Sequence, residues 1–166
     1  MVEIWLKLCL SGICGLILGL ERESKHKPLG IKTCVVISVT SCLLTIVSIG
    51  GAALTDNKQS FISADPLRLA AQIVSGVGFL GAGVILRKNN DVISGLTTAA
   101  IVWTASGLGI AVGAGFYIET LSGVALIFLG IKVIPFIMKK IGPRALREQE
   151  VKISVMVGLD ENIQNI

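Results

Sequence analysis

The sequence predicts an all-α transmembrane helix bundle with five spanning helices. Of its 166 residues, 52% are hydrophobic and only 16% are charged, and the mean hydropathy is +0.80. Soluble domains carry about 25% charged residues. Several long stretches contain at most one charge, and each approaches the roughly 20 residues that a helix needs to cross a hydrocarbon core. Helices are expected because lipid offers backbone polar groups no partner outside the chain.

Five segments qualify as spans. Two of them, 4–20 and 120–138, contain one lysine each, Lys7 and Lys132, whose long side chains can reach an interface. The first segment follows Glu3 instead of a basic region and lacks a small-residue cleavage site, so we interpret it as a retained helix and not a signal peptide. The other three segments contain no charge and cover residues 33–54, 69–86 and 96–118.

Basic residues predict the orientation. Eleven of the fifteen Lys and Arg residues lie in the segments 21–32 and 87–95 and after residue 138. Five helices place these segments on one side, which the positive-inside rule makes the cytoplasm. We therefore expect the N-terminus outside and the C-terminus in the cytoplasm. The net charge of +4 is then a topology signal, and no nucleic-acid partner is expected because no basic face carries interleaved aromatic residues.

Reactive side chains are scarce. The four cysteines have no C-x-x-C spacing and lie in apolar segments, so we interpret them as small buried hydrophobic residues. The single histidine, His26, lies in a charged loop, and no serine has a histidine at a spacing typical of a base. We expect no enzyme activity, no catalytic residue and no cofactor-binding residue. The cysteines are Cys9, Cys14, Cys34 and Cys42.

The segment 76–83 is rich in glycine and fits the pattern G-x-G-x-x-G. That pattern binds dinucleotides only between a strand and a helix, whereas here it lies inside an apolar span. Close helix packing is favoured, with a broken helix lining an ion site as the alternative. Small residues also recur at spacings of four and three in segments 71–82, 100–111 and 11–19. The glycines predicted to pack helices are Gly15, Gly19, Gly76, Gly78, Gly81 and Gly83.

An internal repeat is visible at an offset of 65 residues. Arg22 and Gly30 correspond to Arg87 and Gly95, and apolar segments flank both loops. Parallel repeats predict a pseudo-axis along the membrane normal, and chance similarity of short loops is the alternative. Threonines that follow both glycines are predicted N-caps of helices whose positive ends would suit an anion or an acidic partner. These threonines are Thr33, Thr97 and Thr98.

The start of the third span predicts a cap and a polar face. Asp65 is a good N-cap and Pro66 fits the first helical position. Arg68 and Gln72 are four residues apart, so they share a face and are expected to line an interhelical crevice. At the other side of the membrane, Glu21 is expected to form an interfacial charge pair with Arg22. A local pair between Glu21 and Lys25 is the alternative. The functional polar set is Glu21, Arg22, Asp65, Arg68, Gln72, Thr97 and Thr98.

The positions of the carboxylates indicate whether the chain could conduct a cation. Asp65 and Glu21 are the candidate ligands for a cation such as Mg²⁺, which prefers oxygen atoms. The predicted orientation puts Asp65 and Thr97 on opposite faces of the membrane, so they cannot share one site unless a helix is broken. No carboxylate lies deep in a span. We therefore expect the few hydrophilic groups to gather at the rims and not to form a wet passage.

Three stretches resemble signatures of the MgtC/SapB family of membrane proteins: 19–33, 65–83, and 95–100 followed by Trp103. The resemblance covers residues 4–138 in order, and Lys32 stands where the family usually has arginine. It implies a bacterial inner-membrane protein that acts in adaptation to low magnesium and in survival inside host cells, hence in virulence. It further implies regulation or binding of other membrane complexes, including ATP synthase. A magnesium transporter is the alternative.

The tail alternates apolar and polar residues from 151 to 159, which predicts one β-strand. Longer members of the family carry a cytoplasmic ACT-like domain after the last helix. We therefore interpret residues 1–140 as the transmembrane domain and 141–166 as a linker and the first strand of a truncated ACT-like domain. A homo-oligomer in the lipid bilayer is expected, and a dimer is favoured, because small helix faces support close association.

Overall fold

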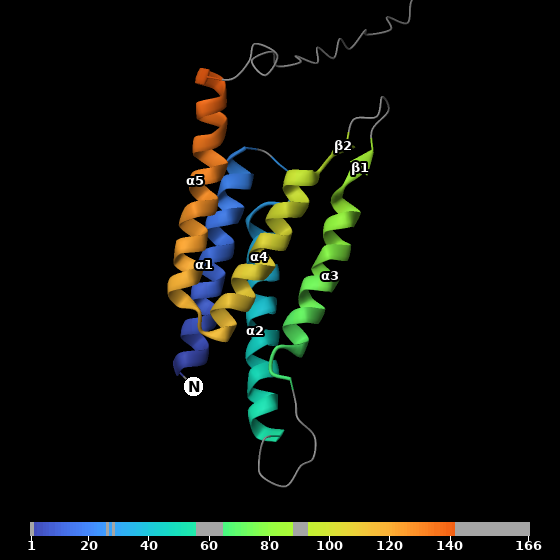
Figure 1. Cartoon of the computed structure of the whole chain (residues 1–166), viewed down its shortest axis with the longest axis vertical. Coiled ribbons are helices and arrows are strands. Elements are labelled where there is room, and N and C mark those ends of the chain that lie inside the picture. Colours follow the sequence, from blue (N-terminus) through green and yellow to red (C-terminus); the bar gives the residue numbers. More distant parts are fainter. Residues whose placement is uncertain (1, 26, 28, 56–64, 88–92, 142–166) are drawn as a thin grey trace, which may run out of the picture. The chain divides into compact units, whose positions relative to one another are not determined.

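Five α-helices make up most of the part of the chain that the computed structural model describes, which is residues 2–25, 27, 29–55, 65–87 and 93–141 (Figure 1). Two short strands, β1 (Leu86–Arg87) and β2 (Ile93–Ser94), pair antiparallel between α3 and α4. Apart from these two short strands, the predicted all-α architecture is confirmed. The helices are α1 (Val2–Ser24), α2 (Ile31–Thr55), α3 (Arg68–Val84), α4 (Leu96–Ala114) and α5 (Tyr117–Ile141).

Four helices are long and apolar enough to cross a membrane, namely α1, α2, α4 and α5. The helix α3, which the sequence predicts as the third of five spans, has 17 residues and is not among these four. At about 1.5 Å per residue it rises about 25 Å, slightly less than the hydrocarbon core. The chain is therefore built as a multi-pass membrane protein.

Residues 1–128 and 129–166 form two compact units. The first contains α1 to α4 and the start of α5. In the second, the described residues are the end of α5, where Leu129, Lys132, Val133 and Ile134 are exposed. The predicted strand at 151–159 and the proposed linker lie outside the described residues, as does His26.

The core of the first unit lies where α1, α2 and α4 meet. The helix α2 packs extensively against both α1 and α4, whereas α3 packs mainly on α4 (Figure 1). Leu18 of α1 and Val102 and Val112 of α4 are the largest fully buried apolar side chains. Since α4 contacts three other helices, it is the most buried helix of this unit, and nine of its residues are buried.

The repeat predicted from the sequence is visible in the helix order. Helices α2 and α4 begin at Ile31 and Leu96, which are equivalent in the repeat, and run in the same direction in Figure 1. The hydroxyls of Ser41 and Ser106 lie 3.0 Å apart, and these two residues are separated by 65 positions. Each is therefore the repeat equivalent of the other. Equivalent residues of the repeat therefore meet where α2 packs against α4.

Two predicted spans end elsewhere than expected. The fourth span was predicted to reach residue 118, but α4 ends at Ala114, because Gly115 adopts a left-handed conformation (φ +92°) that terminates the helix. The third was predicted to reach residue 86, but Leu86 belongs to β1. The segment 76–83 lies within an uninterrupted helix, so both the broken helix and the nucleotide motif are contradicted.

The predicted N-caps are also wrong. Thr33, Thr97 and Thr98 lie inside their helices, in the first turn. Gly95 precedes α4 with a φ of +94°, and a Cβ there would clash with the carbonyl of Val84. This close return between the two helices requires glycine and leaves no room for a capping side chain.

The start of α3 differs from its prediction as well. The helix begins at Arg68, with Asp65 and Pro66 in the preceding turn. The Asp65 carboxylate accepts the N–H of Leu67 at 2.9 Å, which is an Asx-turn and not an N-cap. The N–H of Leu69 instead points to the hydroxyl of Ser48 on α2, at 3.4 Å.

Glycine packing is confirmed in α1 but not in most of α3. A Cβ on Gly15 would lie 2.7 Å from the carbonyl oxygen of Cys34, and one on Gly19 would clash with Ile31, so α1 contacts α2 at the backbone. In α3, a Cβ on Gly81 would lie 3.6 Å from the Cβ of Ala99, which is an ordinary packing distance. Three other glycines that are predicted to pack helices have open space around them within the single chain: Gly76, Gly78 and Gly83.

Candidate functional site

A row of hydroxyl side chains runs through the core between α1, α2 and α4. We call it the hydroxyl seam and define it as Ser11, Ser38, Ser41, Thr45 and Ser106, all of which are buried. The Ser38 hydroxyl donates to the Ser11 carbonyl at 2.9 Å and lies 2.9 Å from its hydroxyl. Thr45 donates to the Ser41 carbonyl at 2.8 Å. The hydroxyls of the seam therefore find hydrogen-bond partners within the protein, as polar groups inside a membrane require.

The seam has little free width, because α2 and α4 touch at the backbone. A Cβ on Gly113 would lie 2.7 Å from the Cys42 carbonyl oxygen and 2.9 Å from Cβ of Thr45. A Cβ on Gly109 would clash with the Ser38 carbonyl oxygen. Real Cβ atoms do not approach other atoms this closely, so only glycine allows this contact.

The expectation that hydrophilic groups gather at the rims is therefore wrong in part. Ser11, Ser38 and Ser41 are at most 3% exposed, and they lie well inside the spanning segments. Their small hydroxyls bond across helices or back to their own backbone, so they enter the core without bringing a charge.

A charged cluster lies at the end of α1. We call it the Arg22 cluster and define it as Glu21, Arg22, Lys25 and Thr98. The Nη2 of Arg22, which is 4% exposed, donates to the hydroxyl of Thr98 in the first turn of α4. The buried carboxylate of Glu21 pairs with Lys25 one turn later, as the alternative interpretation proposed. The sequence predicted that these polar residues matter, and the structure brings Arg22 and Thr98 together across 76 positions.

Glu23 fixes the turn into α2. Its Oε2 accepts the N–H of Ile31 at 3.1 Å, which satisfies one of the free donors at the start of α2. A Cβ on Gly30 would clash with this carboxylate. Glu23 therefore takes the role predicted for Thr33.

The opposite end of the seam is closed by Lys7. Its ammonium donates to the carbonyl of Gly113 at 3.2 Å and pairs with Glu3 at 3.3 Å. Gly113 lies in the last turn of α4, where carbonyls lack helical partners and a cation is favourable. Lys7 thus binds α1 to α4 instead of only reaching an interface.

The remaining predicted site residues do not join either cluster. Arg68 and Gln72 are exposed on α3, so the predicted interhelical crevice is not formed. Thr97 is exposed next to the buried Thr98. Asp65 lies before α3, and Glu21 belongs to the Arg22 cluster at the end of α1. Among the described residues, no group of three or more His, Cys, Asp or Glu side chains is placed to hold a metal ion.

Several residues that build the site escaped sequence reasoning. Gly109 and Gly113 are spaced four apart, as small packing residues often are, but this spacing did not distinguish them from Gly107, which faces open space. Ser11, which was noted as a small residue, and Ser38 carry hydroxyls whose partners lie on other helices. Their role becomes visible only once α1, α2 and α4 are adjacent.

The fold and these clusters define a multi-pass helical membrane protein with a hydrogen-bonded core. The model of the MgtC family matches residues 8–140. The chain is 52% identical over 164 residues to protein SapB of Bacillus subtilis, covering 99% of the chain and 70% of SapB. The chain therefore belongs to the MgtC family.

Two further relatives are similar to the chain, and the name of one mentions magnesium. The "Putative magnesium transporter YhiD" of Escherichia coli K12 is 40% identical over 132 residues, which are 79% of this chain and 60% of YhiD. Protein MgtC of Brucella abortus is 36% identical over 125 residues, which are 73% of this chain and 47% of MgtC. No solved structure matches the chain.

Proposed function

We propose that this chain is a bacterial inner-membrane protein that supports growth at low magnesium and survival inside host cells. It acts by binding and regulating other membrane complexes, and not by catalysis. Membership of the MgtC family and similarity to MgtC and YhiD support the magnesium link. The N-terminus lies outside and the C-terminus in the cytoplasm, as the distribution of basic residues favours.

The observation that carries the proposal is the backbone contact between α2 and α4. Gly109 and Gly113 lie against the carbonyls of Ser38 and Cys42. Magnesium keeps several waters and demands oxygen ligands at about 2.1 Å. The contact leaves no room for such an ion along the hydroxyl seam, and the serines there already bond to one another. A binding role is therefore favoured over a conducting one.

A basic surface beside the Arg22 cluster is suited to a partner. Lys25, Lys27 and Lys32 are exposed around the end of α1 and the start of α2. An acidic surface of a membrane complex such as ATP synthase has the complementary charge, and such pairing speeds association and selects the partner. The buried Arg22 fixes the helix ends that display these lysines.

A magnesium transporter is the alternative, and the name of YhiD favours it. It requires that the seam open into a hydrated path in another state of the protein. Glu21 and Asp65 would then be the carboxylates that bind the ion at the two ends.

We further propose that the protein is a dimer. The face of α3 that was predicted to pack helices is exposed in the single chain and consists of small residues, which permit close approach of a second α3. These residues are Ala71, Ser75, Gly78 and Ala82.

Growth of a deletion strain at limiting magnesium tests the proposed role. The wild-type gene should restore growth, and the triple variant Lys25→Gln, Lys27→Gln, Lys32→Gln should fail although it reaches the membrane in normal amounts. Lys132→Gln, which also removes an exposed lysine, is the control and should restore growth. Full rescue by the triple variant would refute the basic surface as the docking site, and absence of a growth defect in the deletion strain would refute the role itself.

A further inference from the structure

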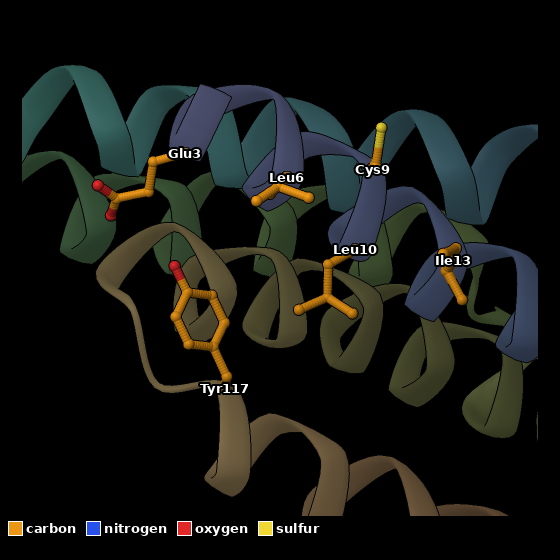
Figure 2. Close-up of a pocket in the computed structure, with 6 residues that line it drawn as sticks. All are labelled: Glu3, Leu6, Cys9, Leu10, Ile13 and Tyr117. Carbon is orange, nitrogen blue, oxygen red and sulfur yellow. The ribbon is translucent and has the colours of Figure 1, made fainter. Parts of the chain in front are cut away.

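An apolar groove lies between α1 and the start of α5 (Figure 2). Its volume is about 580 Å³. Tyr117 directs its ring from the first residue of α5 toward α1, and Leu10 points toward the same space. The lining residues are Glu3, Leu6, Cys9, Leu10, Ile13 and Tyr117.

The groove is polar at one end only. Glu3 and the hydroxyl of Tyr117 lie at the N-terminal end of α1, and the remaining lining side chains are apolar or weakly polar. From Glu3 to Ile13 the helix rises about 15 Å, which is about half of the 30 Å hydrocarbon core, or one leaflet. Tyrosine is typical of the interface between headgroups and acyl chains. The groove thus has the length and polarity of one lipid chain with its headgroup beside Glu3.

The charge at the polar end selects the headgroup. The Glu3 side chain pairs with Lys7 and is still 75% exposed. The Lys7 side chain is 16% exposed, and its ammonium already donates to the Gly113 carbonyl. The carboxylate is therefore the accessible charge, and it complements a primary ammonium group.

We propose that this groove binds one acyl chain of a phospholipid whose headgroup carries a primary ammonium, in the leaflet nearest the N-terminus. The ammonium pairs with Glu3, the Tyr117 hydroxyl contacts the headgroup region, and Leu6, Leu10 and Ile13 contact the chain. The lining favours lipid over a second helix, because close helix contacts use small residues, whereas Leu6 and Ile13 are large and more than half exposed.

Native mass spectrometry of the full chain in mild detergent tests the site. The probes are phosphatidylethanolamine, phosphatidylcholine, which lacks N–H donors, and anionic phosphatidylglycerol. We expect one retained phosphatidylethanolamine per chain. Glu3→Gln should lower its retention about two- to fivefold, as expected for loss of an exposed ion pair. Glu119→Gln, which removes an exposed carboxylate outside the groove, is the matched control and should change nothing.

Filling the groove provides a second variant. Ile13→Trp should abolish the retained lipid, whereas Leu80→Trp on the exposed face of α3 should not. Equal retention of all three lipids, unchanged retention in Ile13→Trp, or displacement of the lipid by a co-purifying membrane helix would each overturn the proposal.

A chemical readout keeps the test independent of these variants. Cys9 lines the groove and is exposed, whereas Cys14, Cys34 and Cys42 are buried. Phosphatidylethanolamine should slow maleimide labelling of Cys9 more than phosphatidylcholine does. It should not slow labelling at Leu80→Cys on α3 in a Cys9→Ser background. Equal effects at both positions would contradict a lipid site in the groove.

Discussion

Arg22 shows how a residue at the end of one helix can stabilise a contact between two. A charged group in a nearly inaccessible position requires hydrogen-bond acceptors. The hydroxyl of Thr98 supplies one of them from α4. The buried Glu21 beside it pairs with Lys25, so both signs of charge are present where α1 meets the predicted cytoplasmic face.

Replacing Thr98 by valine should destabilise the protein by about 1.5–3 kcal/mol, because the buried guanidinium loses an acceptor at nearly constant side-chain volume. Thr97→Val, at the exposed neighbouring position, should change stability by less than about 0.5 kcal/mol. Thermal unfolding in detergent measures both. Equal effects at the two positions would show that the Arg22–Thr98 bond does not stabilise the fold.

The polarity of Arg22 and Thr98 was sufficient to identify them as candidate functional residues, but it did not predict that they contact each other. Arg22 and Thr98 stand out because charged and polar groups are rare near apolar spans. Their contact depends on α1 and α4 being neighbours, which no local pattern encodes. For Arg68 and Gln72 the contact was predicted but is not formed. Their spacing places them on one face of α3, as predicted. The spacing cannot tell whether that face contacts another helix.

Helix packing depends on which glycines meet a neighbour. Gly113 lies against the backbone of Cys42 in α2, whereas Gly107, two turns earlier on the same helix, faces open space. Both occur in an apolar stretch with small residues at helical spacing. The existence of the helices therefore follows from hydropathy, but the packing face of α4 does not, because nearly its whole surface is apolar.

Adding one methyl group at Gly113 should cost about 1–3 kcal/mol, because the Cβ would force α2 and α4 apart. Gly107→Ala should be neutral or stabilising by up to about 1 kcal/mol, since alanine favours helix. Thermal unfolding of the two variants in one detergent distinguishes these effects. A Gly113→Ala protein as stable as Gly107→Ala would contradict the close contact along the hydroxyl seam.

The 65-residue repeat relates the two halves of the molecule. The hydroxyls of Ser41 and Ser106, which are equivalent in the repeat, lie 3.0 Å apart, and α2 and α4 begin at equivalent residues. The number of helices and the repeat were predictable from apolar runs and a loop motif. The caps of these helices were predicted wrongly, since Glu23 accepts the N–H at the start of α2 and Gly95 precedes α4 where threonines were expected. Their roles depend on close approaches between segments, which sequence-local rules do not describe.

The exposed small face of α3 leads to a prediction about assembly. Gly78→Leu places a large side chain on that face without touching another part of the single chain, since nothing lies within 4 Å of a Cβ there. It should convert a dimer to a monomer in native mass spectrometry. Gly123→Leu, at an equally open position on α5, should leave the dimer intact. A persistent dimer in Gly78→Leu would place the interface elsewhere.

Magnesium flux into proteoliposomes tests most directly whether the core is closed. Purified protein would be reconstituted with a magnesium-sensitive dye inside the vesicles, and the external concentration would be raised stepwise. Because α2 and α4 touch at Gly109 and Gly113, the account predicts a flux equal to that of protein-free vesicles. A saturable flux that is lost in Glu21→Gln or Asp65→Asn would contradict it and establish transport.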